Sequence, residues 1–209
     1  MSARLIYAFD PLCGWCYGFI PAMRALTAAH PDLPIDLRMG GLVTGERIRP
    51  YADMATYIRG AHQQMASVTG MALGAPFFDR ILASPTIIAS SLIPCAALLQ
   101  VRAARPEKTL DFAHAVQIAH FRDGDDLGDP AVYARLAAKT GLDLDFNLPG
   151  PRDLTPALAM EFSATRQFGV RAYPTLLVQN PDGSVEELAR DYNPARFVAM
   201  ISAWREKAA

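Results

Sequence analysis

The sequence predicts an α/β fold in which a helical segment separates a βαβ unit from a ββα unit. Three observations predict this order. Short strand-like runs at residues 5–9 and 35–39 flank a helical stretch near the N-terminus. Strand patterns then disappear from residue 44 to residue 147, where alanine-rich helical segments follow one another. Near the C-terminus, an apolar run ending at residue 178 and a polar turn before residues 184–188 predict a β-hairpin. We therefore expect a discontinuous domain over residues 1–43 and 148–209, and an inserted helical domain over residues 44–147.

The N-terminal unit begins with a run whose length fits a buried strand, residues 5–9. Helical spacing follows Pro11 and continues to about residue 29, with Pro21 inside the helix, where a proline produces a kink. His30, Pro31 and Pro34 mark a turn, and residues 35–39 alternate as a strand does. A strand, a helix and a second strand in this order predict two parallel strands.

The predicted insert contains several helices and no strand. One helix is expected to open at Pro50 and Tyr51 and to be interrupted at Gly70 and Gly74, and another begins at Pro94. A further helix has an N-cap followed by proline, Asp129-Pro130, and Gly141 at its C-terminal end. We expect the insert to pack on the N-terminal unit, because no flexible linker joins them.

The C-terminal unit is predicted from its turn and cap residues. Thr155-Pro156 opens a helix that closes at Gly169. Residues 180–183 have the composition of a tight turn, so the strands on either side should pair as a hairpin. Asn193-Pro194 caps a final helix that carries apolar residues on one face.

Composition excludes several classes of protein. The 209 residues are 51% hydrophobic and 20% charged, with a formal net charge of −1, so we expect neither a nucleic-acid nor an anionic-membrane partner. No apolar run reaches the roughly 20 residues that cross a bilayer. Too few apolar residues precede Asp10 for a signal peptide, so the sequence predicts a cytoplasmic protein.

Cys13 and Cys16 lie where the first strand gives way to the first helix. Backbone N–H groups at the start of a helix have no intrahelical partners and carry a partial positive charge, which favours a thiolate there. Two intervening residues place the second sulfur about one helical turn away, within reach of a disulfide formed on the first. This spacing indicates Cys13 as a nucleophile and Cys16 as a resolving thiol.

The same spacing also suits one half of a zinc site. A closed zinc site needs two more ligands, and the candidates are Cys95, His30, His62, His114 and His120. No two of these form a convincing pair, so we expect no metal. Cys95 is expected to be a small buried apolar residue, and Asp10 to serve in the turn and not as a proton carrier.

The segment from Phe9 to Phe19, Phe-Asp-Pro-Leu-Cys-Gly-Trp-Cys-Tyr-Gly-Phe, with Pro21 behind it, resembles the active-site helix of the thioredoxin superfamily. Its residues are similar to those of the FrnE-like branch of the DsbA family of thiol-disulfide oxidoreductases. The order of elements along the chain also resembles that of the DsbA family. The resemblance implies a thioredoxin-like fold with a helical domain inserted between its βαβ and ββα halves. It also implies disulfide exchange or isomerisation through Cys13 and Cys16.

The resemblance assigns the substrate site as well. In this family the proline at the position of Pro174 is cis and faces the nucleophilic cysteine, so Tyr173 and Pro174 would hold an extended substrate beside Cys13. Trp15 is either an exposed aromatic residue above the site or a substrate contact. No bound cofactor is implied. The expected partner is a protein or peptide carrying a disulfide or thiol, and glutathione is a candidate exchange partner.

Two alternatives stay open. Glutathione-dependent enzymes of the kappa-class transferase and 2-hydroxychromene-2-carboxylate isomerase type look similar in fold, but they need a single group at the position of Cys13. The presence of Cys16 at exchange spacing argues against them. The other alternative is a catalytically idle module that binds peptides on the Pro174 face.

Overall fold

The computed structural model describes residues 3–208 and contains a four-stranded sheet of order β2-β1-β5-β6. The strands are β1 (Arg4–Phe9), β2 (Ile35–Met39), β5 (Thr175–Gln179) and β6 (Val185–Leu188). β1 runs parallel to β2 and antiparallel to β5, and β5 is antiparallel to β6. The two ends of the chain therefore build one sheet, with β1 at its centre.

The predicted helix after β1 is split in two. α1 (Gly14–Gly18) and α2 (Ile20–Ala29) meet at Phe19, and Pro21 occupies the first turn of α2. Proline is tolerated there because that position needs no intrahelical N–H donor. The kink expected at Pro21 is thus confirmed, and it separates the short helix after Cys13 from the longer one that supports it.

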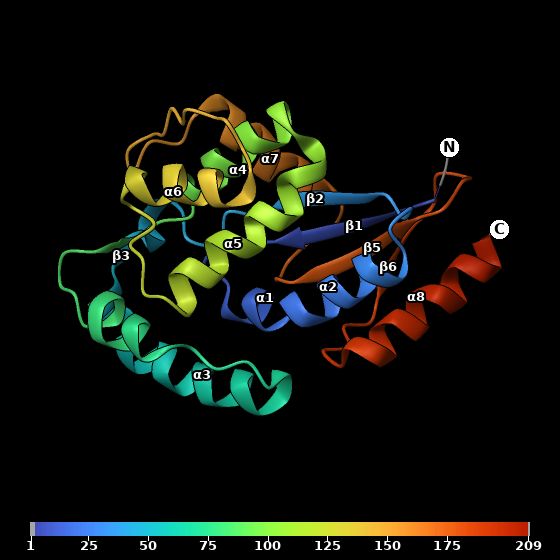
Figure 1. Ribbon diagram of the computed structural model, residues 1–209, viewed down its shortest axis with the longest axis horizontal. Coiled ribbons are helices and arrows are strands. Elements are labelled where there is room, and N and C mark those ends of the chain that lie inside the picture. Colours follow the sequence, from blue (N-terminus) through green and yellow to red (C-terminus); the bar gives the residue numbers. More distant parts are fainter. Residues whose placement is uncertain (1–2, 209) are drawn as a thin grey trace.

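The C-terminal elements are those that the sequence predicts. α7 (Pro156–Gln167) begins at Thr155, whose side chain accepts a hydrogen bond from the Leu158 N–H. β5 and β6 form the hairpin, and α8 (Pro194–Ala208) follows. α8 packs against α2, and Figure 1 shows these two helices on the same side of the sheet as α1.

The predicted insert contains four longer helices, which follow β2 and precede α7 along the chain. They are α3 (Ala55–Thr69), α4 (Leu92–Ala104), α5 (Thr109–Phe121) and α6 (Pro130–Thr140). α6 has the predicted ends, since the Asp129 side chain accepts from the Ala131 N–H and Gly141 adopts φ 70°. In Figure 1, α4, α5, α6 and α7 gather beside β1 and β2, whereas α3 lies away from them next to α1.

The expectation that the insert holds no strand is wrong. β3 (Arg49–Pro50) and β4 (Ile88–Ala89) pair antiparallel, and the Tyr51 N–H extends their contact by donating to the Ile87 carbonyl at 3.0 Å. Strands this short leave no alternation of apolar residues to detect. The helix expected from Pro50 starts later, because Tyr51–Met54 forms a 3₁₀ turn (η2) before α3. Other short helical turns are η1 (Gly45–Arg47), η3 (Phe77–Leu82, a π-helix) and η4 (Pro106–Lys108).

An ion pair joins the inserted helices to the sheet. Arg102 of α4 donates from Nη1 to Glu161 Oε1 of α7 at 2.9 Å and to the Leu37 carbonyl of β2 at 3.0 Å. Glu161 in turn accepts from the Met39 N–H at 3.1 Å. A buried carboxylate with several donors is well compensated, so α4, α7 and β2 are held in one arrangement.

His114 on α5 should make the fold sensitive to acid. It is buried, neither ring nitrogen has a hydrogen-bond partner, and burial lowers its pKa from 6.5 to about 3. Between those two values only the unfolded chain binds the proton, so stability is complete above pH 6.5 and falls as the pH drops toward 3. Each such group adds about 1.4 kcal/mol per pH unit to the slope of the free energy of unfolding against pH in this range.

We expect His114→Leu to flatten this dependence. Urea unfolding measured at several pH values from 7 to 4 checks it, because the free energy of unfolding of the variant should fall less steeply than that of the wild type. His120→Gln is the comparison variant, since burial also lowers the pKa of His120, to about 4. Equal slopes for His114→Leu and the wild type would contradict the assignment.

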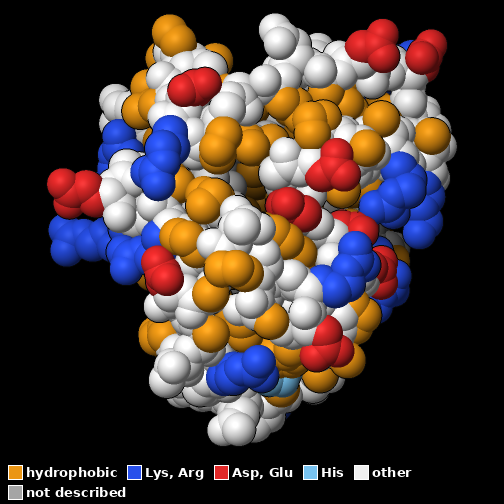
Figure 2. Space-filling view, turned by 90° about the vertical axis from the view of Figure 1, so that its left-hand side faces the viewer, with side chains coloured by type: hydrophobic (Ala, Val, Ile, Leu, Met, Phe, Trp, Pro, Cys, Tyr) orange, Lys and Arg blue, Asp and Glu red, His pale blue; other side chains and the backbone are white. Residues whose placement is uncertain are grey.

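Among the described residues, no helix is both long and apolar enough to span a bilayer. Figure 2 shows acidic, basic and hydrophobic side chains intermingled over one face of the molecule. This mixture agrees with the near-neutral net charge of the chain.

Candidate active site

Cys13 caps the N-terminus of α1. Its backbone is extended, with φ −86° and ψ 111°, and its carbonyl accepts from the N–H groups of Cys16 and Tyr17 at 3.0 and 3.1 Å. The side chain is 6% exposed, and Sγ donates to the Tyr173 carbonyl oxygen at 3.3 Å. The expected position at the boundary of strand and helix is confirmed, and Cys13 lines the opening of a surface hollow.

Cys16 lies behind Cys13 and is fully buried. Burial, followed by the hydrogen bond and the charge of Cys13, raises the pKa of Cys16 well above its ordinary value. Cys13, Cys16 and Cys95 are all free thiols in this structure. The pair is therefore in its dithiol form, and the inner sulfur keeps its proton while the outer sulfur faces the opening.

The Tyr173-Pro174 peptide bond is cis, and Pro174 is buried next to the cysteine pair. Tyr173 Oη donates to the Gly40 carbonyl at 2.9 Å, and burial raises the pKa of Tyr173 to about 12, so its hydroxyl stays protonated. Arg190 donates from Nη1 to the Pro174 carbonyl at 2.9 Å. Hydrogen bonds thus hold the loop that faces Cys13 at Tyr173 and at Pro174.

Trp15 is half-buried, and its ring packs on Tyr192 with a centroid distance of 5.6 Å. It lines two hollows. One, of about 370 Å³, is lined by Cys13 and by mostly apolar residues that include Tyr57 and Ile58 of α3. The other, of about 670 Å³, is lined by Tyr173, Tyr192 and Arg190, among others.

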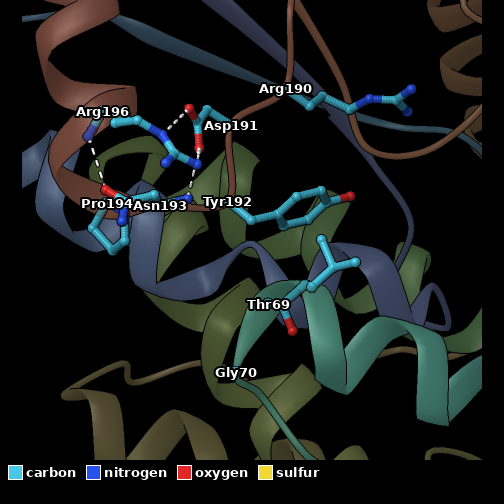
Figure 3. A pocket seen from close by; sticks show the side chains of 9 residues that line it. Thr69, Gly70, Arg190, Asp191, Tyr192, Asn193, Pro194 and Arg196 are labelled. Carbon is cyan, nitrogen blue, oxygen red and sulfur yellow. Dashed lines mark hydrogen bonds and ion pairs between the residues drawn. The ribbon is translucent and has the colours of Figure 1, made fainter.

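A third hollow, of about 480 Å³, continues past Tyr192 between the end of α3 and the start of α8. Figure 3 shows Tyr192 reaching across it above Thr69, while Arg190 points away from the other side chains. Arg196 is occupied by an ion pair with Asp191, Nε to Oδ2 at 2.7 Å. Tyr192 is therefore a wall shared by two of the three hollows around the site.

Asp10 accepts more hydrogen bonds than a turn residue needs. Its Oδ1 accepts from the Leu12 N–H at 2.9 Å, as expected for a turn residue. The carboxylate is also fully buried, with Oδ1 accepting from Ser91 Oγ at 2.9 Å and Oδ2 from the Leu42 N–H at 2.7 Å. Burial raises the pKa of Asp10, and these hydrogen bonds oppose that rise. Asp10 thereby fixes the turn before Cys13 to the loop after β2 and to the start of α4.

Of the remaining candidates, only His62 lies at the opening. Cys95 is completely buried in the main apolar cluster, as expected, and burial raises the pKa of its thiol. Among residues 3–208, no three His, Cys, Asp or Glu side chains are grouped as metal ligands. His62 lines the smaller hollow, whereas His114 and His120 are buried on α5.

Several residues of the site were not predicted from the sequence. Tyr192, Arg190, Leu42 and Ser91 are far from Cys13 along the chain, and only the packing of α4, α8 and the β2 loop brings them together. One local feature could have drawn attention to Tyr192, because it directly precedes the Asn193-Pro194 cap of the last helix. Nothing in the sequence near Ser91 or Leu42 indicates their contact with Asp10.

No protein-family model matches the chain, and no curated protein matches its sequence. Solved structures do match. The cytosolic disulfide reductase DsbM from Pseudomonas aeruginosa is 24% identical, with a TM-score of 0.83, over 98% of this chain and 100% of DsbM. The same protein solved with GSH is 23% identical, with a TM-score of 0.80, over 97% of this chain and 99% of that one.

Two further structures belong to the comparison. A putative protein disulfide isomerase from Nitrosomonas europaea is 19% identical over the whole of both chains, with a TM-score of 0.76. A 2-hydroxychromene-2-carboxylate isomerase is 14% identical, with a TM-score of 0.57, over 97% of this chain and 95% of that one. These likenesses show that the chain has the DsbA-like thioredoxin fold with its inserted helices, as the sequence predicts.

Proposed function

We propose that this protein is a cytoplasmic enzyme that exchanges thiols and disulfides through its Cys13-Gly14-Trp15-Cys16 motif. The observation that carries the proposal is the contact of Cys13 Sγ with the carbonyl of Tyr173, 3.3 Å away, in a loop with a cis proline. An extended substrate chain that pairs with this loop would bring its own disulfide to the one sulfur of the pair that faces the opening.

The reaction needs only the two cysteines and the substrate. The Cys13 thiolate attacks one sulfur of a substrate disulfide, and the other substrate sulfur leaves as a thiol after taking up a proton. Cys16 then attacks Cys13 Sγ and breaks the mixed disulfide, and the second substrate sulfur leaves with the proton that Cys16 gave up. The substrate gains two electrons, and Cys13 and Cys16 end as a disulfide.

Reduction or isomerisation of substrate disulfides is the direction we propose. A dithiol is the resting form in a reducing cytoplasm, and the matching structure from Pseudomonas aeruginosa is titled a cytosolic disulfide reductase. That reductase was also solved with GSH, which supports glutathione as an exchange partner that restores the dithiol here. No bound cofactor takes part in the exchange.

The substrate we propose is a disulfide-bearing or thiol-bearing protein or peptide. Tyr173 and Pro174 would contact its backbone. Trp15 would contact a neighbouring side chain, since Trp15 and Tyr173 line the same two hollows. The smaller hollow is mostly apolar, so it suits an aliphatic or aromatic side chain next to the reacting cysteine.

One alternative has its own support. The match to a 2-hydroxychromene-2-carboxylate isomerase over nearly the whole of both chains favours a glutathione-dependent isomerase or transferase as the second candidate. In such an enzyme Cys13 alone would engage glutathione, and Cys16 would have no chemical task.

Two assays on the purified wild-type protein separate the candidates. Reduction of insulin disulfides, followed by turbidity with dithiothreitol or glutathione as the reductant, should be faster with the protein than without it. Conjugation of glutathione to an aromatic electrophile should stay at the background rate. The opposite pair of results favours the second candidate, and no activity in either assay favours an idle binding module.

A further inference from the structure

An arginine lines each of the two hollows at the cysteine pair. Arg171 lines the smaller hollow together with Cys13, and Arg190 lines the larger one. The two hollows adjoin, because Trp15, Ala172 and Tyr173 line both of them. A ligand that holds its sulfur at Cys13 and extends into both hollows would therefore meet a guanidinium group in each.

Both arginines have donors available for such a ligand. Arg171 is exposed, and its side chain makes no hydrogen bond or ion pair with any of residues 3–208. Arg190 donates from Nη1 to the Pro174 carbonyl at 2.9 Å, which leaves its Nε and Nη2 for another acceptor. Figure 3 shows Arg190 pointing away from Asp191, whose carboxylate is paired with Arg196.

The two hollows differ in the charges that line them. In the smaller hollow, His62 is neutral at pH 7 because burial lowers its pKa, so Arg171 is the one charged side chain among the described residues that line it. The larger hollow contains Glu187 as well as Arg190. The smaller hollow therefore suits a lone carboxylate, and the larger one suits a group that carries both an ammonium and a carboxylate.

Glutathione, γ-glutamyl-cysteinyl-glycine, has this distribution of charges about its cysteine. Its glycine end is a lone carboxylate, and its γ-glutamyl end carries an ammonium and a carboxylate on one carbon. We infer that Arg171 binds the glycine carboxylate, and that Arg190 and Glu187 bind the γ-glutamyl end, of a glutathione whose thiol lies at Cys13. This inference rests on the proposed function, in which glutathione restores the dithiol.

Glutathione bound in this way reduces the oxidised pair in two exchanges. Its thiolate attacks Cys13 Sγ, the bond between Cys13 and Cys16 breaks, and Cys16 leaves as a thiol after taking up a proton. A second glutathione thiolate attacks the sulfur of the bound glutathione. Glutathione disulfide forms, Cys13 leaves and takes up a proton, and the cysteine pair has gained the two electrons that two glutathiones lost.

The apolar part of the smaller hollow remains for the protein substrate. Glycine has no side chain, so bound glutathione would leave the surfaces of Tyr57, Ile58 and Met65 uncovered. A protein substrate that buries an apolar side chain there would gain binding energy that glutathione does not gain. One site would thus serve the two partners in turn, and the charged residues would select glutathione.

The rate at which thiols reduce the oxidised protein tests the role of Arg171. Protein with the Cys13–Cys16 disulfide is mixed with glutathione or with dithiothreitol, which is uncharged, and is then quenched, alkylated and analysed by mass spectrometry. In Arg171→Gln we expect the ratio of the second-order rate constant for glutathione to that for dithiothreitol to fall by about fivefold, the upper end for an exposed ion pair.

Arg105→Gln is the matched control. Arg105 is exposed at the end of α4 and lines neither hollow, so its substitution removes the same charge from the protein without touching the site. Its ratio of rate constants should equal that of the wild type. Arg190 is left intact in these experiments, because it also holds the Pro174 carbonyl.

Modified glutathiones assign the two ends. The glycine ethyl ester lacks the charge that Arg171 would bind, so Arg171→Gln should slow the reaction of glutathione and not that of the ester. Acetylation of the γ-glutamyl amine removes the ammonium that Glu187 would bind. Glu187→Gln should accordingly slow the reaction of glutathione and not that of the acetylated form.

An unchanged ratio in Arg171→Gln, or equal slowing of glutathione and its ester by that variant, would overturn the inference and leave the exchange reaction in place. The wild-type protein with the ester gives a second measurement that requires no variant to fold, since its ratio to dithiothreitol should also be about fivefold lower than with glutathione. Failure of the wild type to form a Cys13–Cys16 disulfide would contradict the proposed function, and this inference with it.

Discussion

Replacing Cys13 by serine is expected to reduce insulin reduction to the rate of the reductant alone. Cys13 Sγ is the sulfur that faces the opening and contacts the Tyr173 carbonyl, whereas Cys16 is fully buried. A serine hydroxyl has no accessible anion at neutral pH and cannot form a disulfide. No other thiol can take over the first attack, because Cys95 is also fully buried.

Replacing Cys16 by serine should give a different defect. The first attack survives, so the variant should accumulate a stable mixed disulfide between Cys13 and the substrate, visible as an added mass in non-reducing mass spectrometry. Turnover should fall to near the background rate. Cys95→Ser is the control and should retain wild-type turnover. Normal turnover by Cys16→Ser would refute a resolving role and favour the glutathione-dependent alternative.

Replacing Gly40 by alanine should damage the site without touching a cysteine. A Cβ built on Gly40 would lie 1.8 Å from Cζ and 2.1 Å from Oη of Tyr173, so the ring would have to leave its place. The hydrogen bond from Tyr173 Oη to the Gly40 carbonyl would be lost with it, and the loop that faces Cys13 would shift. We expect kcat/KM for insulin reduction to fall about tenfold or more, with a stability loss of about 1–3 kcal/mol, typical of overpacking.

Gly60→Ala is the matched control for that variant. Gly60 lies inside α3, a Cβ added there would meet nothing within 4 Å, and alanine favours a helix at such a position by about 0.5–1 kcal/mol. It should keep full activity and gain stability. Full activity of Gly40→Ala at a temperature where it is folded would show that the position of Tyr173 is unimportant for substrate binding.

Local chemistry explains which parts of the fold the sequence could predict. Asp129, Pro130 and Gly141 define the ends of α6 by themselves, because a cap, a fixed φ and a left-handed residue act within one turn of the chain. The Cys13 and Cys16 spacing is likewise local, and the hairpin follows from its turn residues. These elements are where the sequence predicts them.

Contacts between distant segments explain what the sequence did not reveal. In the sequence, Tyr7 is one more aromatic residue in a buried strand, and its place in the same apolar cluster as Cys13 and Cys16 appears only when α1 packs on the sheet. Asp10 looks like a turn residue until the β2 loop and α4 bring Leu42 and Ser91 to it. The β3 and β4 strands, two residues each, pair because of the loops around them and not because of a pattern of their own.

The state of the cysteines in a glutathione redox buffer tests the central claim most directly. Protein is equilibrated at a series of ratios of reduced to oxidised glutathione, alkylated and digested. The masses of its peptides are then measured by mass spectrometry. We predict that Cys13 and Cys16 interconvert between a dithiol and a disulfide within one peptide, with a single two-electron midpoint, while Cys95 becomes alkylated only after unfolding. If both cysteines stay alkylatable at every ratio, or if Cys13 carries glutathione and never pairs with Cys16, the protein does not act by dithiol-disulfide exchange.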